Sequence, residues 1–290
     1  MTLANGNQLG YSIIGPSTAK QSVFLFHGNP SSRLEVADWT NVVEELNFRM
    51  ICIDRPGLGL STYQANRALS NWPSQVLEVA DHLGFEHIKV AGSSGGGPYA
   101  LACAHQLPPS RLVNTAIIAG IGEFSLGRFW AASPQQFISW CLAKYLPSLR
   151  AAIVKSSLLP PVQSSDPKVY EAFIDKLITS FGKEAQSMFP LNSLERHTLA
   201  CTFKEHFSQG LEGHLQEVKV LTLPWPFRME DIQGNVRLFW GNKDDLAPLS
   251  MGQEMAKRIP GAELKVFDGA DHFSLTYRHG KEIMEDFLGR

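Results

Sequence analysis

A serine lies inside a glycine-rich turn that follows a short apolar run. Residues 90–97 read VAGSSGGG, which contains the pattern G-x-S-x-G with Ser94 at its centre. A nucleophile on a sharp strand-to-helix turn has strained backbone angles and close neighbours, so small residues are needed two positions before and after it. Gly92 and Gly96 occupy those two positions. The pattern therefore predicts that Ser94 is a nucleophile.

The same turn permits two other interpretations. Ser93 also has small residues two positions to either side, so the nucleophile could be displaced by one residue. A glycine-rich turn can also serve only for packing or for binding phosphate. The apolar run before the turn, the helical pattern after it and the glycines directly following Ser94 favour Ser94.

Two polar residues that follow later apolar runs complete a candidate catalytic group. A serine hydroxyl needs a base, and the base needs an orienting acid. Asp244 follows the run 236–240 and His272 follows the run 264–267, which gives the chain order serine, acid, histidine. Because sites in open α/β sheets lie at the carboxyl ends of strands, we predict a triad of Ser94, Asp244 and His272. The adjacent Asp245 is the alternative acid.

Acyl transfer also needs donors for the negative charge that develops on the carbonyl oxygen. Two preorganised backbone N–H groups supply this stabilisation in serine hydrolases. Gly95, the residue after the nucleophile, is expected to give one. The sequence HGNP at 27–30 follows an early apolar run, and Asn29 is expected to give the other because Pro30 has no N–H. We expect His27 to brace this loop.

Alternating strands and helices are predicted to position these residues. Apolar runs closed by glycine or a polar residue indicate strands buried on both faces. They fall at 23–26, 50–53, 88–91, 115–119, 236–240 and 264–267, with helical patterns at 73–83, 95–105 and 251–259. A hairpin is predicted at the start, between 2–4 and 9–14. The alternation predicts an α/β fold with a mostly parallel central sheet flanked by helices.

A long helical stretch interrupts this alternation. An aromatic-rich stripe and the segments 169–181 and 199–218 read as helices, and a plain crossover between strands needs far fewer residues. We therefore predict a core domain formed by 1–122 and 232–290, with residues 123–231 inserted as a helical cap, or lid. The stripe comprises Phe129, Trp130, Phe137, Trp140, Cys141 and Tyr145.

Composition excludes several classes of protein. Hydrophobic residues make up 44% and charged residues 19%, and the net charge is −2, which indicates a globular protein without a nucleic-acid partner. No apolar run is long enough for a membrane span, and the first 20 residues do not read as a secretory signal. The cysteines are far apart and suit free thiols in a reducing compartment, the cytoplasm. They are Cys52, Cys103, Cys141 and Cys201.

The remaining polar motifs suit structural roles. His197, His206 and His214 lie at irregular spacing without acidic partners at metal-ligand offsets, so we expect no metal, and no pattern calls for a cofactor. Asp54 and Arg55 open a strand-end loop, where a structural ion pair is expected rather than chemistry.

Taken together, these motifs resemble the α/β-hydrolase fold family, in particular the capped group of haloperoxidase-like esterases, epoxide hydrolases and haloalkane dehalogenases. The matching segments lie in the predicted core, and the cap gives no match. Epoxide hydrolases and dehalogenases carry an aspartate where this sequence has Ser94, so the resemblance implies acyl-enzyme chemistry instead. The matching segments are 27–30, 54–61, 92–98, 241–248 and 269–273.

The expected function is that of a serine hydrolase cleaving an ester or lactone of a small, fairly apolar molecule. We expect the protein to be a monomer or a homodimer. The one binding partner that we expect is this small-molecule substrate. Two alternatives remain open at this point. The triad could form a lactone or act as a lyase on a metabolite, or the scaffold could serve as a small-molecule receptor.

Overall fold

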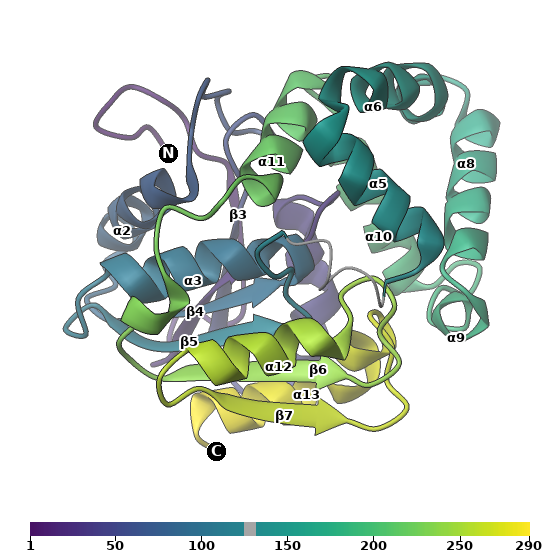
Figure 1. Ribbon diagram of the computed structural model, residues 1–290. Coiled ribbons are helices and arrows are strands. Elements are labelled where there is room, and N and C mark those ends of the chain that lie inside the picture. Colours follow the sequence, from purple (N-terminus) through teal and green to yellow (C-terminus); the bar gives the residue numbers. More distant parts are fainter. Residues whose placement is uncertain (125–131) are drawn as a thin grey trace.

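A seven-stranded sheet forms the centre of the computed structural model, which describes residues 1–124 and 132–290 (Figure 1). The strand order is β1-β3-β2-β4-β5-β6-β7, with β1 antiparallel to β3 and every other neighbouring pair parallel. This confirms the predicted α/β class and the mostly parallel sheet. The strands are Tyr11–Ile14 (β1), Ser22–Phe26 (β2), Arg49–Ile53 (β3), Ile88–Ser93 (β4), Leu112–Ile118 (β5), Val236–Gly241 (β6) and Glu263–Phe267 (β7).

Side chains of the central strands alternate between two hydrophobic cores. In β2, Phe24 and Phe26 enter one core, and Val23 and Leu25 enter the other. This follows from the twofold period of a strand, and it explains why four consecutive residues of β2, 23–26, are all apolar. The edge strand β7 differs because several of its residues are partly or fully exposed, so the prediction of burial on both faces is wrong there.

Helices cover both faces of the sheet. The first core is closed by α2 (Trp72–His82), α3 (Gly97–Gln106) and α12 (Leu249–Arg258), and the second by α1 (Thr40–Glu45) and α13 (Ser274–Leu288). The ribbon shows α3 and α12 on the side of the sheet opposite α13 (Figure 1). Pro73 and Pro98 lie in the first turns of α2 and α3, where the missing N–H costs no helical hydrogen bond.

The start of the chain corrects the predicted hairpin. Only a single antiparallel bridge, between Thr2 and Gln8, joins the two sides of the turn. The second half of the predicted hairpin instead forms β1, which pairs with β3 so that Tyr11 lies opposite Ile53. A turn sequence fixes the local chain reversal, but it does not determine which strand becomes the partner.

Seven α-helices among the described residues lie between β5 and β6 in the chain. In the ribbon they gather at the end of the sheet toward which β6 and β7 point (Figure 1). Ser133, Asp166 and Ser193 cap three of them by accepting from backbone N–H groups of the first turn. The helices are Pro134–Tyr145 (α5), Pro147–Ile153 (α6), Leu159–Val162 (α7), Pro167–Ser180 (α8), Lys183–Gln186 (α9), Leu194–His206 (α10) and Glu212–Thr222 (α11).

Two expectations for this helical segment need comment. The single helix predicted over 199–218 is instead the pair α10 and α11, which are separated by a turn in which Gly210 has φ 98°. Of the predicted aromatic stripe, Phe129 and Trp130 lie outside the described residues. The other members lie on α5, where Trp140 is buried and Tyr145 is exposed. The predicted division between core and cap stays a prediction.

Within residues 1–124 and 132–290, no helix is both long and apolar enough to cross a bilayer.

Candidate active site

Ser94 lies directly after β4, at the turn into α3. Its φ is +48°, whereas Ser93 is extended with φ −91° and ψ 131°, so the strained position in this turn is Ser94. The flanking glycines are needed for close approach. A Cβ on Gly92 would lie 2.5 Å from the Gly96 carbonyl oxygen, and one on Gly96 would lie 2.0 Å from the carbonyl oxygen of Phe26. The turn therefore has the strained geometry that the G-x-S-x-G pattern predicts.

His272 and Asp244 meet across the ends of β6 and β7. The Nδ1 of His272 donates to Oδ2 of Asp244 over 2.7 Å, and the other oxygen of Asp244 accepts from the N–H groups of Leu246 and Ala247. Asp244 is buried, and Asp245 is exposed. The carboxylate that orients His272 is therefore Asp244, because the turn directs these neighbouring side chains differently.

This pairing changes the acid–base behaviour of His272. Burial alone would lower the pKa of the ring, but the Asp244 carboxylate attracts the protonated form and accepts its hydrogen bond, so the pKa of His272 is raised above its ordinary value of 6.5. Because Nδ1 is bound to the carboxylate, Nε2 is the nitrogen left to exchange a proton with a hydroxyl.

The loop after β2 faces the elbow. The Gly28 N–H donates to Oε2 of Glu35 over 2.8 Å, whereas the Asn29 N–H has no acceptor among the described residues. A Cβ on Gly95 would lie 3.3 Å from the Asn29 nitrogen, so the two predicted oxyanion donors belong to adjacent parts of the backbone. His27 donates from Nδ1 to the Gly28 carbonyl, in line with its expected bracing role.

A buried arginine, Arg55, holds the same loop through two hydrogen bonds. Arg55 donates to the carbonyl oxygens of His27 and Gly28 over 2.6 and 2.8 Å. Its ion pair is with Glu217, at 2.8 Å, and Asp54 pairs with Arg33, so the structural ion pairing expected at this loop is present, with partners outside the loop. Each side chain has a charged partner elsewhere because the two leave the strand end in different directions.

Glu217 connects Arg55 to the helical segment. It lies on α11 with no exposed surface, and it also pairs with Arg67 and accepts from the Tyr99 hydroxyl. The two arginines hold the pKa of Glu217 below its ordinary value although burial acts in the opposite direction. One carboxylate on α11 thus pairs with two arginines, and one of them, Arg55, binds the loop after β2.

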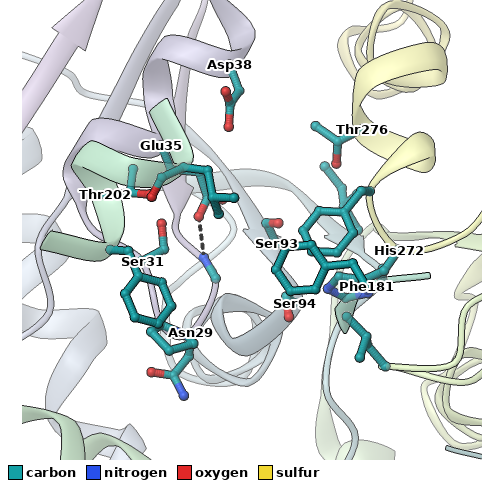
Figure 2. A pocket seen from close by; sticks show the side chains of 18 of the residues that line it. Asn29, Ser31, Glu35, Asp38, Ser93, Ser94, Phe181, Thr202, His272 and Thr276 are labelled. Carbon is teal, nitrogen blue, oxygen red and sulfur yellow. Dashed lines mark hydrogen bonds between the residues drawn. The ribbon is translucent and has the colours of Figure 1, made fainter. Parts of the chain in front are cut away.

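Ser94 and His272 line one cavity of 250 Å³ between the sheet and the helical segment. Figure 2 shows Ser94, His272 and Phe181 on one side of it and Asn29, Ser31 and Glu35 on the other. Most of the wall is apolar, and this part is formed by Trp39, Ile118, Ala119, Ile121, Leu177, Phe181, Leu199, Phe203, Leu246 and Phe273. The cavity can therefore enclose a small, largely apolar molecule beside the hydroxyl of Ser94.

Comparison with protein families gives a match over most of the chain. The profile described as "alpha/beta hydrolase fold" matches residues 21–278, on both sides of the inserted helices. The chain belongs to the α/β-hydrolase fold family. It is an α/β-hydrolase enzyme, which confirms both the resemblance noted in the sequence and the expected enzyme class.

Individual relatives of this α/β-hydrolase are distant. It is 23% identical to the 2-hydroxy-6-oxononadienedioate/2-hydroxy-6-oxononatrienedioate hydrolase of Paraburkholderia phymatum, covering 99% of this chain and 94% of that one. It is 29% identical to the uncharacterized hydrolase YcgS of Bacillus subtilis, covering 98% and 95%. Among solved structures, the enol-lactonase from Burkholderia xenovorans matches with a TM-score of 0.70 and 17% identity, covering 99% of this chain and 98% of that one.

Two acidic residues in the cavity of the hydrolase escaped the sequence analysis. Burial raises the pKa of Glu35, although Ser31 and the Gly28 N–H stabilise its charged form. Burial and the neighbouring Glu35 raise the pKa of Asp38 well above its ordinary value, and Asp38 accepts from the Tyr277 hydroxyl. Both acids follow the oxyanion loop on the short helix Arg33–Trp39, and their nearness to that loop was the one signal available.

The histidines of the helical segment form a hydrogen-bonded chain. His206 donates from Nδ1 to the Ser31 carbonyl over 2.7 Å and accepts at Nε2 from Nδ1 of His214 over 2.9 Å. Nε2 of His214 in turn accepts from Arg150 over 3.2 Å. Burial lowers the pKa of His206 to about 4 and that of His214 well below its ordinary value, so both rings are neutral near pH 7.

In the described part of the chain, no group of three or more histidine, cysteine, aspartate or glutamate side chains is arranged to hold a metal ion.

Proposed function

We propose that this enzyme is a serine hydrolase that cleaves an ester or lactone of a small, fairly apolar molecule. Ser94 is the nucleophile, His272 the base and Asp244 the acid that orients it. The N–H groups of Gly95 and Asn29 form the oxyanion hole. The observation that carries the proposal is the 2.7 Å bond from His272 to Asp244, with His272 lining the same cavity as the strained Ser94.

The proposed reaction has two stages. The Ser94 oxygen attacks the carbonyl carbon while its proton passes to Nε2 of His272, and the resulting oxyanion accepts from the two backbone N–H groups. The tetrahedral intermediate then collapses, and the bond to the leaving oxygen breaks. The leaving oxygen takes the proton from His272, and the acyl group remains on Ser94. Water then attacks this ester with His272 as base and releases the acid.

The size and charge of the cavity support this substrate class. Its 250 Å³ lies just below the range of about 300 to 1,000 Å³ that is usual for ligand pockets, which suits a small substrate. Among its described lining residues, the acids Glu35 and Asp38 are present and lysine and arginine are absent. A dicarboxylate, as named for the Paraburkholderia relative, would lack a cationic partner there. A neutral ester or lactone needs no cationic partner.

The helical segment 123–231 acts in this proposal as a cap that excludes water from the acyl-enzyme. Its residues Leu177, Phe181 and Phe203 supply part of the cavity wall, which supports a role in substrate choice. The four cysteines are free, which supports our further assignment of the enzyme to a reducing compartment, the cytoplasm.

The test is a panel of p-nitrophenyl esters and lactones of graded chain length, assayed with the wild-type enzyme and Ser94→Ala. We expect the wild type to favour small acyl groups and the variant to lose at least about 10³-fold in kcat. Ser93→Ala is the matched control and should retain a folded, active enzyme. Turnover by Ser94→Ala at the wild-type rate would overturn the mechanism.

A second measurement separates hydrolysis from intramolecular acyl transfer. Hydrolysis in water labelled with oxygen-18 places one labelled oxygen in the released acid. Lactone formation gives an unlabelled product instead. We expect the labelled acid, because the proposal assigns the deacylating nucleophile to water.

A further inference from the structure

A second cavity lies in the helical segment, away from Ser94. It has a volume of 570 Å³ and lies between α5 and α6 on one side and α11 on the other, helices that the ribbon shows close together (Figure 1). None of the described residues that line it also lines the cavity of Ser94. We call it the α6–α11 groove. Its separation from the triad means that the proposed acyl transfer does not explain it.

The lining of this groove combines apolar and basic side chains. Ala143, Leu215 and Val218 contribute aliphatic surface. The positively charged lining residues are Lys144, Arg150 and Lys219, and Glu212 is the negatively charged one in the described lining. A groove with this composition suits a ligand that has an apolar body and a negative charge.

Among the charged residues of the groove, Arg150 is the one whose surroundings favour a negatively charged ligand. It donates from one Nη to His214 over 3.2 Å, and its other Nη is buried without a hydrogen-bond partner in the described structure. No carboxylate within 1–124 or 132–290 lies at ion-pair distance from it, and the remaining segment 125–131, SLGRFWA, contains no aspartate or glutamate. Burial accordingly lowers the pKa of Arg150, with no opposing carboxylate.

Several other partly or fully buried arginines in this hydrolase have counter-ions, whereas Arg49 has none among the described residues and lies over the ring of Phe85. Arg33 pairs with Asp54, Arg55 with Glu217 and Arg237 with Asp286. A partly buried guanidinium without a counter-ion is costly, because its lost hydration is not repaid by an opposite charge. An external anion beside Arg150 would supply that charge.

We propose that the α6–α11 groove binds an amphipathic carboxylate, with its charged head on Arg150 and its apolar chain along α11. A carboxylate matches the planar donor fork of a guanidinium, and Leu215 and Val218 provide contacts for a hydrocarbon chain. Lys219 and Lys144 also line the groove and add positive charge to it. This proposal does not depend on the proposed reaction at Ser94.

The experiment is isothermal titration calorimetry of the whole enzyme with decanoate and, separately, with uncharged decanol. We expect wild type to bind decanoate at least about tenfold more tightly than decanol, because only the carboxylate pairs with Arg150. Arg150→Gln should remove this preference. Ala151→Trp, which fills the groove and keeps the arginine, should weaken decanoate binding independently. Raising the ionic strength should also weaken decanoate binding to the wild type.

The matched control is Lys155→Gln, because Lys155 is an exposed cation on the neighbouring turn that does not line the groove. It should bind both compounds as the wild type does. Equal affinity of the wild type for decanoate and decanol, or an unchanged preference in both Arg150→Gln and Ala151→Trp, would overturn the proposal. So would a dimer that depends on Arg150 and forms without any binding of decanoate.

Discussion

His272 depends mainly on Asp244 for its orientation and its basicity, and Asp271 and Asp245 contribute further to its raised pKa. Its Nδ1 is bound to Asp244, whose second oxygen already accepts from two backbone N–H groups. This arrangement keeps the carboxylate fixed and charged beside the ring. The consequence is that Asp244 governs both the rate of the proposed reaction and the pH at which it begins.

Replacing Asp244 with asparagine should therefore lower kcat by about 10³ to 10⁴, because the amide no longer fixes the reactive tautomer. The neutral ring is the base, so wild-type kcat/KM should rise with pH through an apparent pKa above 6.5. In Asp244→Asn that rise should move to lower pH, since the attraction of the carboxylate for the proton is gone. The measurement is kcat/KM from pH 5 to 9.

Asp245→Asn is the control for this prediction. Its side chain is exposed and makes no hydrogen bond to His272 within the described residues, so we expect a change of no more than about twofold. If Asp245→Asn shifted the pH profile and Asp244→Asn did not, Asp245 would be the acid.

Local sequence spacing can identify a functional residue when the backbone around that residue requires particular residue types at fixed positions. Ser94 is predictable because the turn around it admits only glycine at two flanking positions. The choice between Asp244 and Asp245 is not, because neighbouring residues on a turn differ in direction and not in pattern. Asp38 and Glu35 have no motif at all, since their nearness to Ser94 comes from the way a short helix folds back over the strand ends.

At the scale of elements, α11 does more than cover the active site. Its Glu217 pairs with Arg55 and Arg67, and Arg55 in turn binds two carbonyl groups of the loop after β2, the proposed oxyanion loop. A helix of the inserted segment is thereby tied to a loop of the sheet through a buried ionic network. Stability and loop geometry should respond together when this network is broken.

Glu217→Ala should lower the free energy of unfolding by about 3 to 5 kcal/mol, because it leaves two buried guanidinium groups without a counter-ion. The measurement is urea unfolding followed by circular dichroism. Glu212→Ala lies on the same helix at an exposed position and should change stability by less than about 0.5 kcal/mol. If Glu217→Ala lowered the free energy of unfolding by less than about 0.5 kcal/mol, the ionic network would contribute little to stability.

Most elements, but not all their partners, could be predicted from sequence. Apolar runs and helical periodicity are properties of one segment, so β2 to β6 and α2, α3 and α12 appear close to their predicted places. The pairing of β1 with β3 depends on distant residues, and so does the ion pairing of Arg55 with α11. The break at Gly210 was overlooked because the apolar pattern continues across it.

At the scale of the whole molecule, the buried histidine chain links folding to pH. The pKa of His206 is lowered to about 4 by burial, while in the unfolded chain it returns to about 6.5. Between these values the unfolded state binds a proton that the folded state does not. Stability is therefore lost as the pH falls from about 6.5 to about 4.

The comparison that isolates this effect is wild type against His206→Gln. The stability advantage of the wild type should shrink by about 3 kcal/mol between pH 7 and pH 4, measured by chemical unfolding at each pH. His82→Gln, at an exposed site, is the control for loss of one imidazole. An advantage that stays constant over this range would contradict the assignment of a neutral, buried His206.

The position of β6 beside β5 also has a consequence for the order of folding. Thr115 pairs with Val236, so every residue of the helical segment lies within the loop that this pairing closes. During synthesis, the side of β5 that later pairs with β6 remains an unpaired and largely apolar edge until β6 is made. Long-range pairing of this kind is slow, and it leaves the nascent chain open to wrong association at this edge. Asp244 and His272, which come after β6, join Ser94 only in the last stage of assembly.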